Sequence, residues 1–282
     1  MAHAITVGSE EHKELFCRVF TETHLTYDPE RVDWPELDEA TLARLRALPF
    51  WNEAVSTEHD VARKVQALAP LEPDRVLREA IALQGFEEGR HAKLIRALTS
   101  HYRLPADPPA EPPLPADIEW AFIRTGYGEC FDSFFAFGLI QMARDSGFFP
   151  EPLVKLFEPI VQEEARHILF FVNWIAYRRA QQTLPRRPLD WSRCAMAMAL
   201  QVWARIQTAR GAATDDFMLK GHESISMDVS PRGFLRLCLR ENDRRLSPYD
   251  PRLLRPRFVP TIARTALGVL GLPAKLTGKS DG

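Results

Sequence analysis

The amino-acid sequence predicts an all-α protein built on a four-helix bundle, with one long crossover inside the bundle and additional helices after it. Long segments place apolar residues at three- and four-residue spacing, as one face of a helix requires. Alternating β-branched segments are scarce, and no Asn-Gly or Asp-Gly turn joins two apolar segments, so strand signals are weak. A proline-rich stretch divides the first four long helical segments into two pairs.

The first helix pair follows a mixed N-terminal region. Residues 1–48 have the character of short helices and loops, with one helix at about 37–48. A long helix is predicted from about Phe50 to Ala69, and two prolines soon after it end it. Asp74 is a suitable N-cap, because its side chain can accept hydrogen bonds from the first free N–H groups of the next helix. That helix is expected at about Arg75–His101.

A crossover separates the two pairs. The stretch RLPADPPAEPPLPAD contains six prolines and cannot be helical, so it predicts an extended strap. The second pair is expected at about Ile118–Asp145 and Glu151–Gln182. Pro159 lies inside the last segment and should either kink that helix or delay its start. Two antiparallel pairs with one long connection form a four-helix bundle.

The remainder of the chain predicts three more helices, at about 190–210, 231–245 and 258–270. We therefore divide the chain into three parts. Residues 1–48 are an N-terminal extension, residues 49–182 are the bundle, and residues 183–282 are a helical extension packed on the bundle.

Composition and charge exclude several classes of protein. The chain has 282 residues, of which 45% are apolar, so disorder of the whole chain is excluded. The net charge of −2 argues against a general binder of polyanions. The four cysteines form no CxxC pair, which excludes a zinc ribbon or a rubredoxin-type iron site. There is no signal-peptide pattern and no apolar run of about 18 residues, so we expect a cytoplasmic protein without a transmembrane segment.

One internal repeat carries the chemistry. The segments GFEEGRH (85–91) and VQEEARH (161–167) both contain E-E-x-R-H, and each lies in the second helix of its pair. Residues three apart project from the same face of a helix, so Glu88 with His91 can grip one metal ion, and Glu164 with His167 a second. Both pairs lie in apolar stripes, where a carboxylate is costly unless it is paired or bound to a cation. The repeat therefore predicts a buried site for two divalent cations.

Such a site needs one further carboxylate from the first helix of each pair. In the second pair the best candidate is Glu129, which precedes Glu164 by 35 residues and shares its face with apolar residues. Asp132, one turn further on, is the alternative ligand.

In the first pair two glutamates compete. Glu58 shares its helix face with a set of mainly apolar residues: Trp51, Val55, Val61, Ala62, Val65 and Leu68. Glu53 precedes Glu88 by 35 residues, as equal spacing in the two halves would require. Burial favours Glu58 and symmetry favours Glu53, so we take Glu58 as the ligand and keep Glu53 as the alternative.

The pattern E…E-x-x-H…E…E-x-x-H resembles the ferritin-like di-iron carboxylate superfamily over residues 50–180. The residues that carry the resemblance are Glu58, Glu88, His91, Glu129, Glu164 and His167. The repeated E-E-x-R-H looks most like the D-E-x-R-H motif of bacterial multicomponent monooxygenases, and it is also similar to the motifs of arylamine N-oxygenases. Here a glutamate, one methylene longer, replaces the aspartate.

The resemblance implies a fold, a cofactor and two supporting residues. The fold is a ferritin-like bundle, and the cofactor is two iron ions, with manganese or a mixed Mn/Fe pair left open because oxygen-rich sites with two histidines suit both metals. The acidic residue before each ligand glutamate would orient a ligand histidine of the other half. Glu87 would therefore contact His167, and Glu163 would contact His91.

The resemblance also implies an O₂-activating non-haem di-iron oxidase or oxygenase. Its substrate would be a small organic molecule, largely apolar or aromatic, and the reaction would be hydroxylation, N-oxygenation or desaturation with an external electron donor. Two alternatives remain: an iron protein of the ferroxidase or peroxidase type, and a metal-free helical interaction protein. The residues before and after the bundle favour an enzyme, because a cage subunit does not need them.

A stripe of arginines raises the question of a partner. Arg232, Arg236, Arg240 and Arg244 recur at every fourth residue and so share one helix face. The simpler interpretation is a solvated face, and the functional one is a dock for an acidic or phosphate-bearing partner. A homodimer is compatible with the sequence, which does not specify an oligomeric state.

Overall fold

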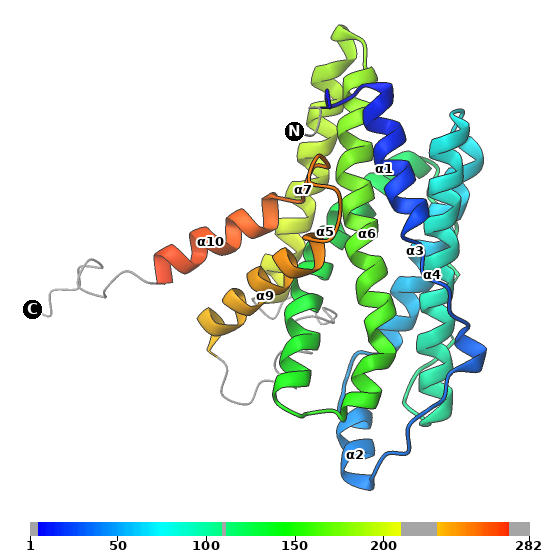
Figure 1. Ribbon diagram of the computed structural model, residues 1–282, viewed down its shortest axis with the longest axis vertical. Coiled ribbons are helices and arrows are strands. Elements are labelled where there is room, and N and C mark those ends of the chain that lie inside the picture. Colours follow the sequence, from blue (N-terminus) through cyan, green and yellow to red (C-terminus); the bar gives the residue numbers. More distant parts are fainter. Residues whose placement is uncertain (1–4, 109–110, 210–229, 271–282) are drawn as a thin grey trace, which may run out of the picture.

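Long helices dominate the protein and lie side by side in a bundle, with further helices packed against it (Figure 1). The computed structural model describes residues 5–108, 111–209 and 230–270, and within them the chain forms nine α-helices and no strand, which confirms the predicted all-α class. The helices are α1 (Glu10–Glu22), α2 (Glu39–Ala47), α3 (Trp51–Leu68), α4 (Arg75–His101), α5 (Ile118–Asp145), α6 (Glu151–Gln181), α7 (Arg187–Ala209), α9 (Pro231–Leu246) and α10 (Phe258–Leu270).

The central bundle consists of α3, α4, α5 and α6. α3 packs along α4, and α5 packs along α6, while contacts between α3 and α5 and between α4 and α6 join the two pairs. α4 and α5 run in the same direction, so the chain must return along the bundle between them (Figure 1). The described part of the proline-rich stretch after His101 makes this return without helix.

Local signals in the sequence place the ends of these helices. The carboxylate of Asp74 accepts hydrogen bonds from the backbone N–H groups of Val76 and Leu77, at 2.9 and 3.1 Å, so it caps α4 as predicted. α6 begins at Glu151 and continues through Pro159, so the proline does not delay its start. α7 begins at Arg187, three residues before the predicted start, because it follows a 3-10 turn at Leu184–Arg186 directly.

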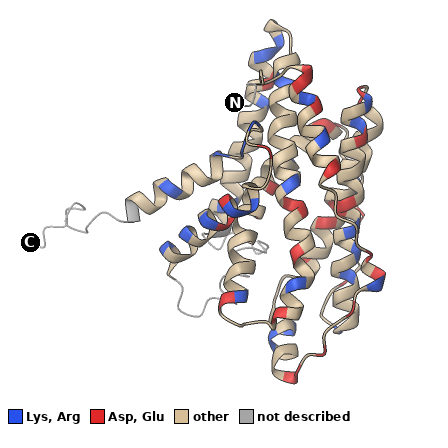
Figure 2. Ribbon diagram, viewed as in Figure 1, with Lys and Arg blue, Asp and Glu red and all other residues tan. Residues whose placement is uncertain are grey.

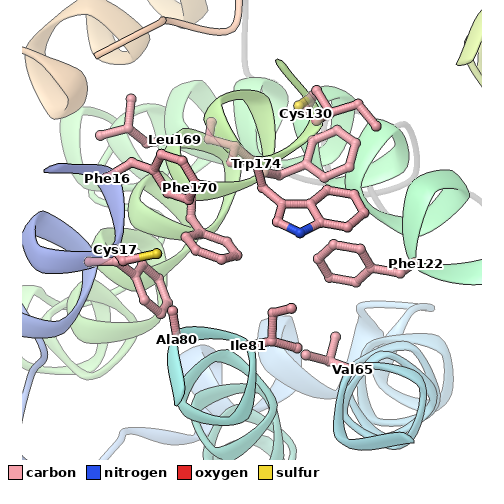
Figure 3. Close-up of a cluster of buried hydrophobic side chains, with 14 of the residues drawn as sticks. Phe16, Cys17, Val65, Ala80, Ile81, Phe122, Cys130, Leu169, Phe170 and Trp174 are labelled. Carbon is pink, nitrogen blue, oxygen red and sulfur yellow. The ribbon is translucent and has the colours of Figure 1, made fainter. Parts of the chain in front are cut away.

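A buried apolar cluster joins the bundle to α1, a helix that the sequence analysis does not specify within its mixed N-terminal region. Figure 3 shows side chains from five helices meeting in this cluster. They include Phe16 and Cys17 of α1, Val65 of α3, Ile81 of α4, Phe122 of α5, and Phe170 and Trp174 of α6. α1 packs on both α4 and α6 and so lies across the two halves of the bundle.

Two glycines of α5 allow close approach of neighbouring helices. A Cβ atom at Gly126 would lie 2.2 Å from Cδ2 of Phe171 on α6, and one at Gly138 would lie 2.4 Å from Sγ of Cys238 on α9. A side chain at either position would therefore push the partner helix away.

The C-terminal helices cover α5. α7 and α9 pack on α5, and α10 packs on α9 and α5. No helix in the described ranges combines the length and the hydropathy that crossing a membrane requires. The division of the chain at residues 48 and 182 stays a prediction.

Candidate metal centre

The two E-x-x-H pairs meet inside the bundle, one from α4 and one from α6. One ligand atom from each of four side chains lies within 4.8 Å of all the others: Glu88, His91, Glu164 and His167. The two histidines are fully buried, and Glu88 is 2% exposed. Ionisable groups this deeply buried are costly unless they bind a cation or one another.

Each glutamate lies closer to the histidine of the other half than to its own. Oε1 of Glu88 is 3.0 Å from Nδ1 of His167, and its Oε2 is 3.7 Å from Nδ1 of His91. Oε1 of Glu164 is 3.2 Å from Nδ1 of His91 and 3.6 Å from Nδ1 of His167. Helix spacing predicts that one E-x-x-H pair holds each ion. In the structure, by contrast, the shorter glutamate–histidine distances are those between the two pairs. Both carboxylates lie between the two imidazoles, where two ions could share them.

The carboxylates expected from the first helix of each pair lie beside this group. Oε2 of Glu58 is 3.5 Å from Nδ1 of His91. Both carboxylate oxygens of Glu129 are buried, and neither has a hydrogen-bond partner in the described part of the chain. Glu58 and Glu129 also line the same cavity as Glu88 and Glu164. Their role as ligands stays a prediction.

The two alternative ligands line this cavity as well. The carboxylate of Asp132 forms an ion pair with the guanidinium of Arg205 on α7. Glu53 lies five residues before Glu58 on α3. The contact of 3.5 Å between Oε2 of Glu58 and Nδ1 of His91 supports Glu58 as the ligand from α3.

Burial and contacts among the glutamates and histidines of the centre change their pKa values. Burial raises the pKa of Glu58 to about 7 and holds the pKa of Glu129 well above its usual range. Burial alone would lower the pKa of His91 and His167, but the carboxylates around them raise both pKa values well above the usual value. In the metal-free protein these groups therefore hold protons that a bound cation would displace.

The residues present fit a pair of metal ions. Nδ1 of His91 and Nδ1 of His167 are buried and, like the Glu129 oxygens, have no hydrogen-bond partner among the described residues. Buried polar atoms are almost always hydrogen-bonded, so these atoms require another partner. Two ligand atoms at right angles, each about 2.1 Å from one ion, lie about 3 Å apart, which is close to the spacing of Glu88 and His167. Carboxylates with two imidazoles suit iron or manganese.

A second layer of contacts surrounds the centre, in which Nε2 of each histidine, the ring nitrogen that faces away from the centre, is hydrogen-bonded to a glutamate. Nε2 of His91 lies 2.9 Å from Oε2 of Glu163, and Nε2 of His167 lies 2.9 Å from Oε2 of Glu87. These are the two contacts that the family resemblance implies. By accepting from Nε2, each glutamate fixes the ring so that Nδ1 faces the centre.

The arginine of each E-E-x-R-H segment completes the arrangement. Nη2 of Arg90 donates to Oε1 of Glu163, and Nη1 of Arg166 donates to Oε1 of Glu87 at 2.8 Å. Together with its histidine, the arginine keeps the pKa of Glu87 at about 2, although burial alone would raise it. The repeat therefore encodes a reciprocal support, in which each half holds the histidine-orienting glutamate of the other. The sequence analysis assigned no role to these arginines.

Residues 24–27 of the N-terminal region cover this second layer, and the sequence analysis missed them. Nδ1 of His24 lies 2.5 Å from Oε1 of Glu87, and the hydroxyl of Tyr27 donates to Oε2 of Glu163 at 3.1 Å. The partners are 63 and 136 residues apart in sequence. No local pattern marks these contacts, because they arise only when the N-terminal region packs across α4 and α6.

An apolar cavity of about 470 Å³ adjoins the glutamates. Its walls come mainly from α3, α5 and α6 and are dominated by large apolar side chains, which include Trp51, Ile95, Leu139, Phe149, Phe157 and Ile160. α7 contributes Arg205, whose ion pair with Asp132 closes part of the wall. The volume lies in the range of cavities that hold a small organic molecule.

Comparison with known proteins finds no matching family model, no similar curated protein and no similar solved structure.

Proposed function

We propose that the protein is an O₂-activating di-iron oxidase or oxygenase of the ferritin-like type, acting on a small, largely apolar or aromatic molecule. One observation supports this above the others: the buried Glu129 carboxylate, which has no hydrogen-bond partner among the described residues, lines an apolar cavity of about 470 Å³ together with Glu58, Glu88 and Glu164. Bound iron would supply the O₂ and redox chemistry, with electrons from an external donor.

Six side chains would hold the two ions. Glu58 lies beside His91. The charge of His167 acts on Glu129 and lowers the pKa of its carboxyl, against the stronger effect of burial. Each ion would therefore have one histidine and one carboxylate of its own. Glu88 and Glu164 lie between the two histidines and would be shared. Four carboxylates balance the charge of two divalent ions.

The remaining residues of the chain prepare the centre for this role. Glu87 and Glu163 accept from Nε2 of the histidines and keep Nδ1 available to a metal. The mainly apolar wall offers a surface on which an apolar substrate could pack beside the centre. Arg205 and Asp132 neutralise each other on that wall, which favours a substrate without charge.

The cavity is also what favours an oxygenase over the iron-handling alternative. A ferroxidase needs a path for hydrated cations, which a wall of large apolar side chains would not provide. An enzyme for an organic substrate needs a dry cavity that reaches the metal ligands. The metal-free alternative leaves the buried Glu129 carboxylate and both Nδ1 atoms without a hydrogen bond among the described residues.

The first experiment is metal analysis. The chain would be loaded anaerobically with Fe(II), desalted and analysed, with Glu164→Ala and His167→Ala as matched variants. We expect about two irons per wild-type chain and loss of iron in both variants. Absence of retained metal in the wild type would contradict the proposal and favour a metal-free interaction protein.

O₂ consumption then separates the two iron-based functions. An oxygenase or oxidase should consume O₂ with an electron donor and an apolar aromatic compound, and its iron content should stay at about two per chain. Iron that accumulates above this content during aerobic Fe(II) addition would instead indicate a ferroxidase.

A further inference from the structure

The C-terminal helices form a second cavity, away from the metal centre. α9, α10 and the loop between them border about 300 Å³. Three arginines line it, Arg255, Arg257 and Arg264, and among the described residues Asp243 contributes the one carboxylate. None of these residues lines the apolar cavity of the metal centre. We propose that this pocket binds the phosphate group of a phosphate monoester.

Arg255 provides the first argument. Its Nη2 donates to the backbone oxygens of Tyr249 and Asp250, at 2.8 and 3.2 Å, which holds the guanidinium in place. Its Nη1 is buried and has no hydrogen-bond partner within the described ranges. Since buried N–H donors are almost always satisfied, an acceptor from outside the described chain belongs at this position. Burial lowers the pKa of Arg255, which indicates that the charges around it do not compensate fully for its own.

The charge of the pocket selects an anion. Asp243 is the one acidic residue that lines the pocket in the described part of the chain, and its Oδ2 is 3.7 Å from Nη2 of Arg264, with both side chains more than half exposed. The last turn of α9 and the first turn of α10 both face the pocket, and these helix ends carry partial charges of opposite sign. The guanidinium groups therefore decide the sign of the potential.

The number of arginines favours phosphate over carboxylate. A guanidinium donates through a planar fork that matches phosphate and carboxylate oxygens. A carboxylate ligand offers two oxygens, whereas a phosphate monoester offers three terminal oxygens and about −1.5 to −2 charges near neutral pH. Ser247 and Thr261 add hydroxyl groups, and Pro256 and Pro260 add apolar surface for an organic group.

The pocket differs from the arginine stripe that the sequence analysis identified. Figure 2 shows basic positions along α9, and the four stripe residues Arg232, Arg236, Arg240 and Arg244 are exposed. Nε of Arg240 and Nε of Arg244 lie 3.3 and 2.6 Å from the carboxylate of Glu241. The stripe shares its charge with Glu241, whereas Nη1 of Arg255 in the pocket is buried and has no hydrogen-bond partner among the described residues. This difference favours the pocket over the stripe as the place of the phosphate.

The test uses the full-length metal-free protein and two probes. Glycerol 3-phosphate, titrated calorimetrically at constant ionic strength, represents a soluble phosphate monoester. Flotation with phosphatidylcholine vesicles, with and without phosphatidic acid, represents a lipid headgroup of the same chemistry. Arg255→Gln and Arg257→Gln should each weaken binding about tenfold or more. Asp243→Asn removes the opposing charge and should strengthen binding several-fold.

The paired variant Arg232→Gln/Arg236→Gln is the matched control, because it removes charge from the same helix without touching the pocket; it should change binding less than about twofold. Arg257 and Asp243 are exposed, so their variants remain informative even if Arg255→Gln lowers the melting temperature. Binding of only the phosphatidic acid vesicles, with the same order of variants, would support the proposal and assign the source to a lipid. Absence of binding to both probes, or loss of binding in the stripe variant alone, would overturn it.

Discussion

Nε2 of His91 lies 2.9 Å from Oε2 of Glu163, although the two residues are 72 positions apart and lie on different helix pairs. The equivalent contact joins His167 of α6 to Glu87 of α4 at the same distance, so here the histidine belongs to the second half and the carboxylate to the first. Each imidazole is thus oriented by a carboxylate that the other half provides. The two halves of the centre are therefore coupled, although each carries a complete E-E-x-R-H motif.

The first prediction concerns this coupling. Glu163→Gln should weaken metal binding by about 10- to 100-fold without removing a ligand, because an amide accepts from Nε2 of His91 more weakly and loses the ion pair with Arg90. Titration of the apo protein with Co(II), followed by visible absorption, measures the change. Glu79→Gln on α4 is the control, since Glu79 forms an exposed ion pair with Arg75, and it should have no effect. Equal affinity of wild type and Glu163→Gln would show that the contact does not support the histidine.

The second prediction separates the two candidate ligands of α3. Glu58→Ala should lower the metal content of the Fe(II)-loaded protein below two per chain, because Oε2 of Glu58 lies 3.5 Å from Nδ1 of His91. Glu53→Ala should retain the wild-type content. Elemental analysis of the two desalted variants decides between them, and the reverse result would make Glu53 the ligand.

The third prediction is that metal binding releases protons. The pKa of Glu58 is about 7, and those of His91, His167 and Glu129 lie well above their usual values, so all four hold protons near neutral pH or below when no metal is bound. These groups must lose their protons to become ligands, and the affinity should therefore rise with pH, about tenfold per pH unit for each proton released. The pKa values of Glu88 and Glu164 are lowered, so these carboxylates are already ionised and contribute no protons.

Calorimetric titration with Mn(II) in buffers of different ionisation enthalpy counts the protons released. His24→Ala is a suitable comparison, since His24 contacts Glu87 rather than the centre, and it should leave the count unchanged. An affinity that is independent of pH would contradict the raised pKa values.

The fourth prediction concerns the packing of α5 on α6. Gly126→Ala should destabilise the protein by about 1–3 kcal/mol, because the added Cβ would lie 2.2 Å from the ring of Phe171. Gly268→Ala on α10 is the matched control: outside its own helix backbone, no atom of the described residues lies within 4 Å of the added Cβ, and alanine favours the helix by about 1 kcal/mol. Urea unfolding of both variants, compared with wild type, gives the two free-energy differences, which should have opposite signs.

The fifth prediction tests the role of the apolar cavity. Ala136 lies on the cavity wall of α5, and Ala136→Phe should fill much of the space without changing a ligand. We expect the iron content to stay at the wild-type level while substrate-dependent O₂ consumption falls at least about tenfold. If O₂ consumption by the loaded variant equals that of wild type, the substrate does not occupy this cavity.

The sequence predicts the helices well because their signals are local. Asp74 caps α4 through its own neighbours, and the prolines of the crossover exclude a helix whatever the rest of the chain does. The E-x-x-H pairs are equally local, since three-residue spacing alone places both side chains on one face. The short helix α1 also has a local N-cap, Ser9, whose hydroxyl accepts from the backbone N–H of His12, but this signal alone does not distinguish α1 within the mixed N-terminal region.

The reciprocal contacts of the centre could not be derived from helix periodicity. Periodicity places Glu88 and His91 on one face, but the exchange of partners between halves depends on how two helices lie across the bundle. The same holds for His24 and Tyr27, whose partners come from distant elements. The resemblance to di-iron proteins pointed to the pairs Glu87–His167 and Glu163–His91, and the arginines and the N-terminal cover became visible only in three dimensions.

The exchange of supports between halves has a consequence for how the fold could originate. A two-helix hairpin with one E-E-x-R-H segment has an orienting glutamate and a histidine, but in this fold such a glutamate contacts the histidine of the other half. In two copies of such a hairpin, the glutamate of each copy could orient the histidine of the other, as in a symmetric dimer. The present chain has the form of that dimer joined end to end by the proline-rich crossover.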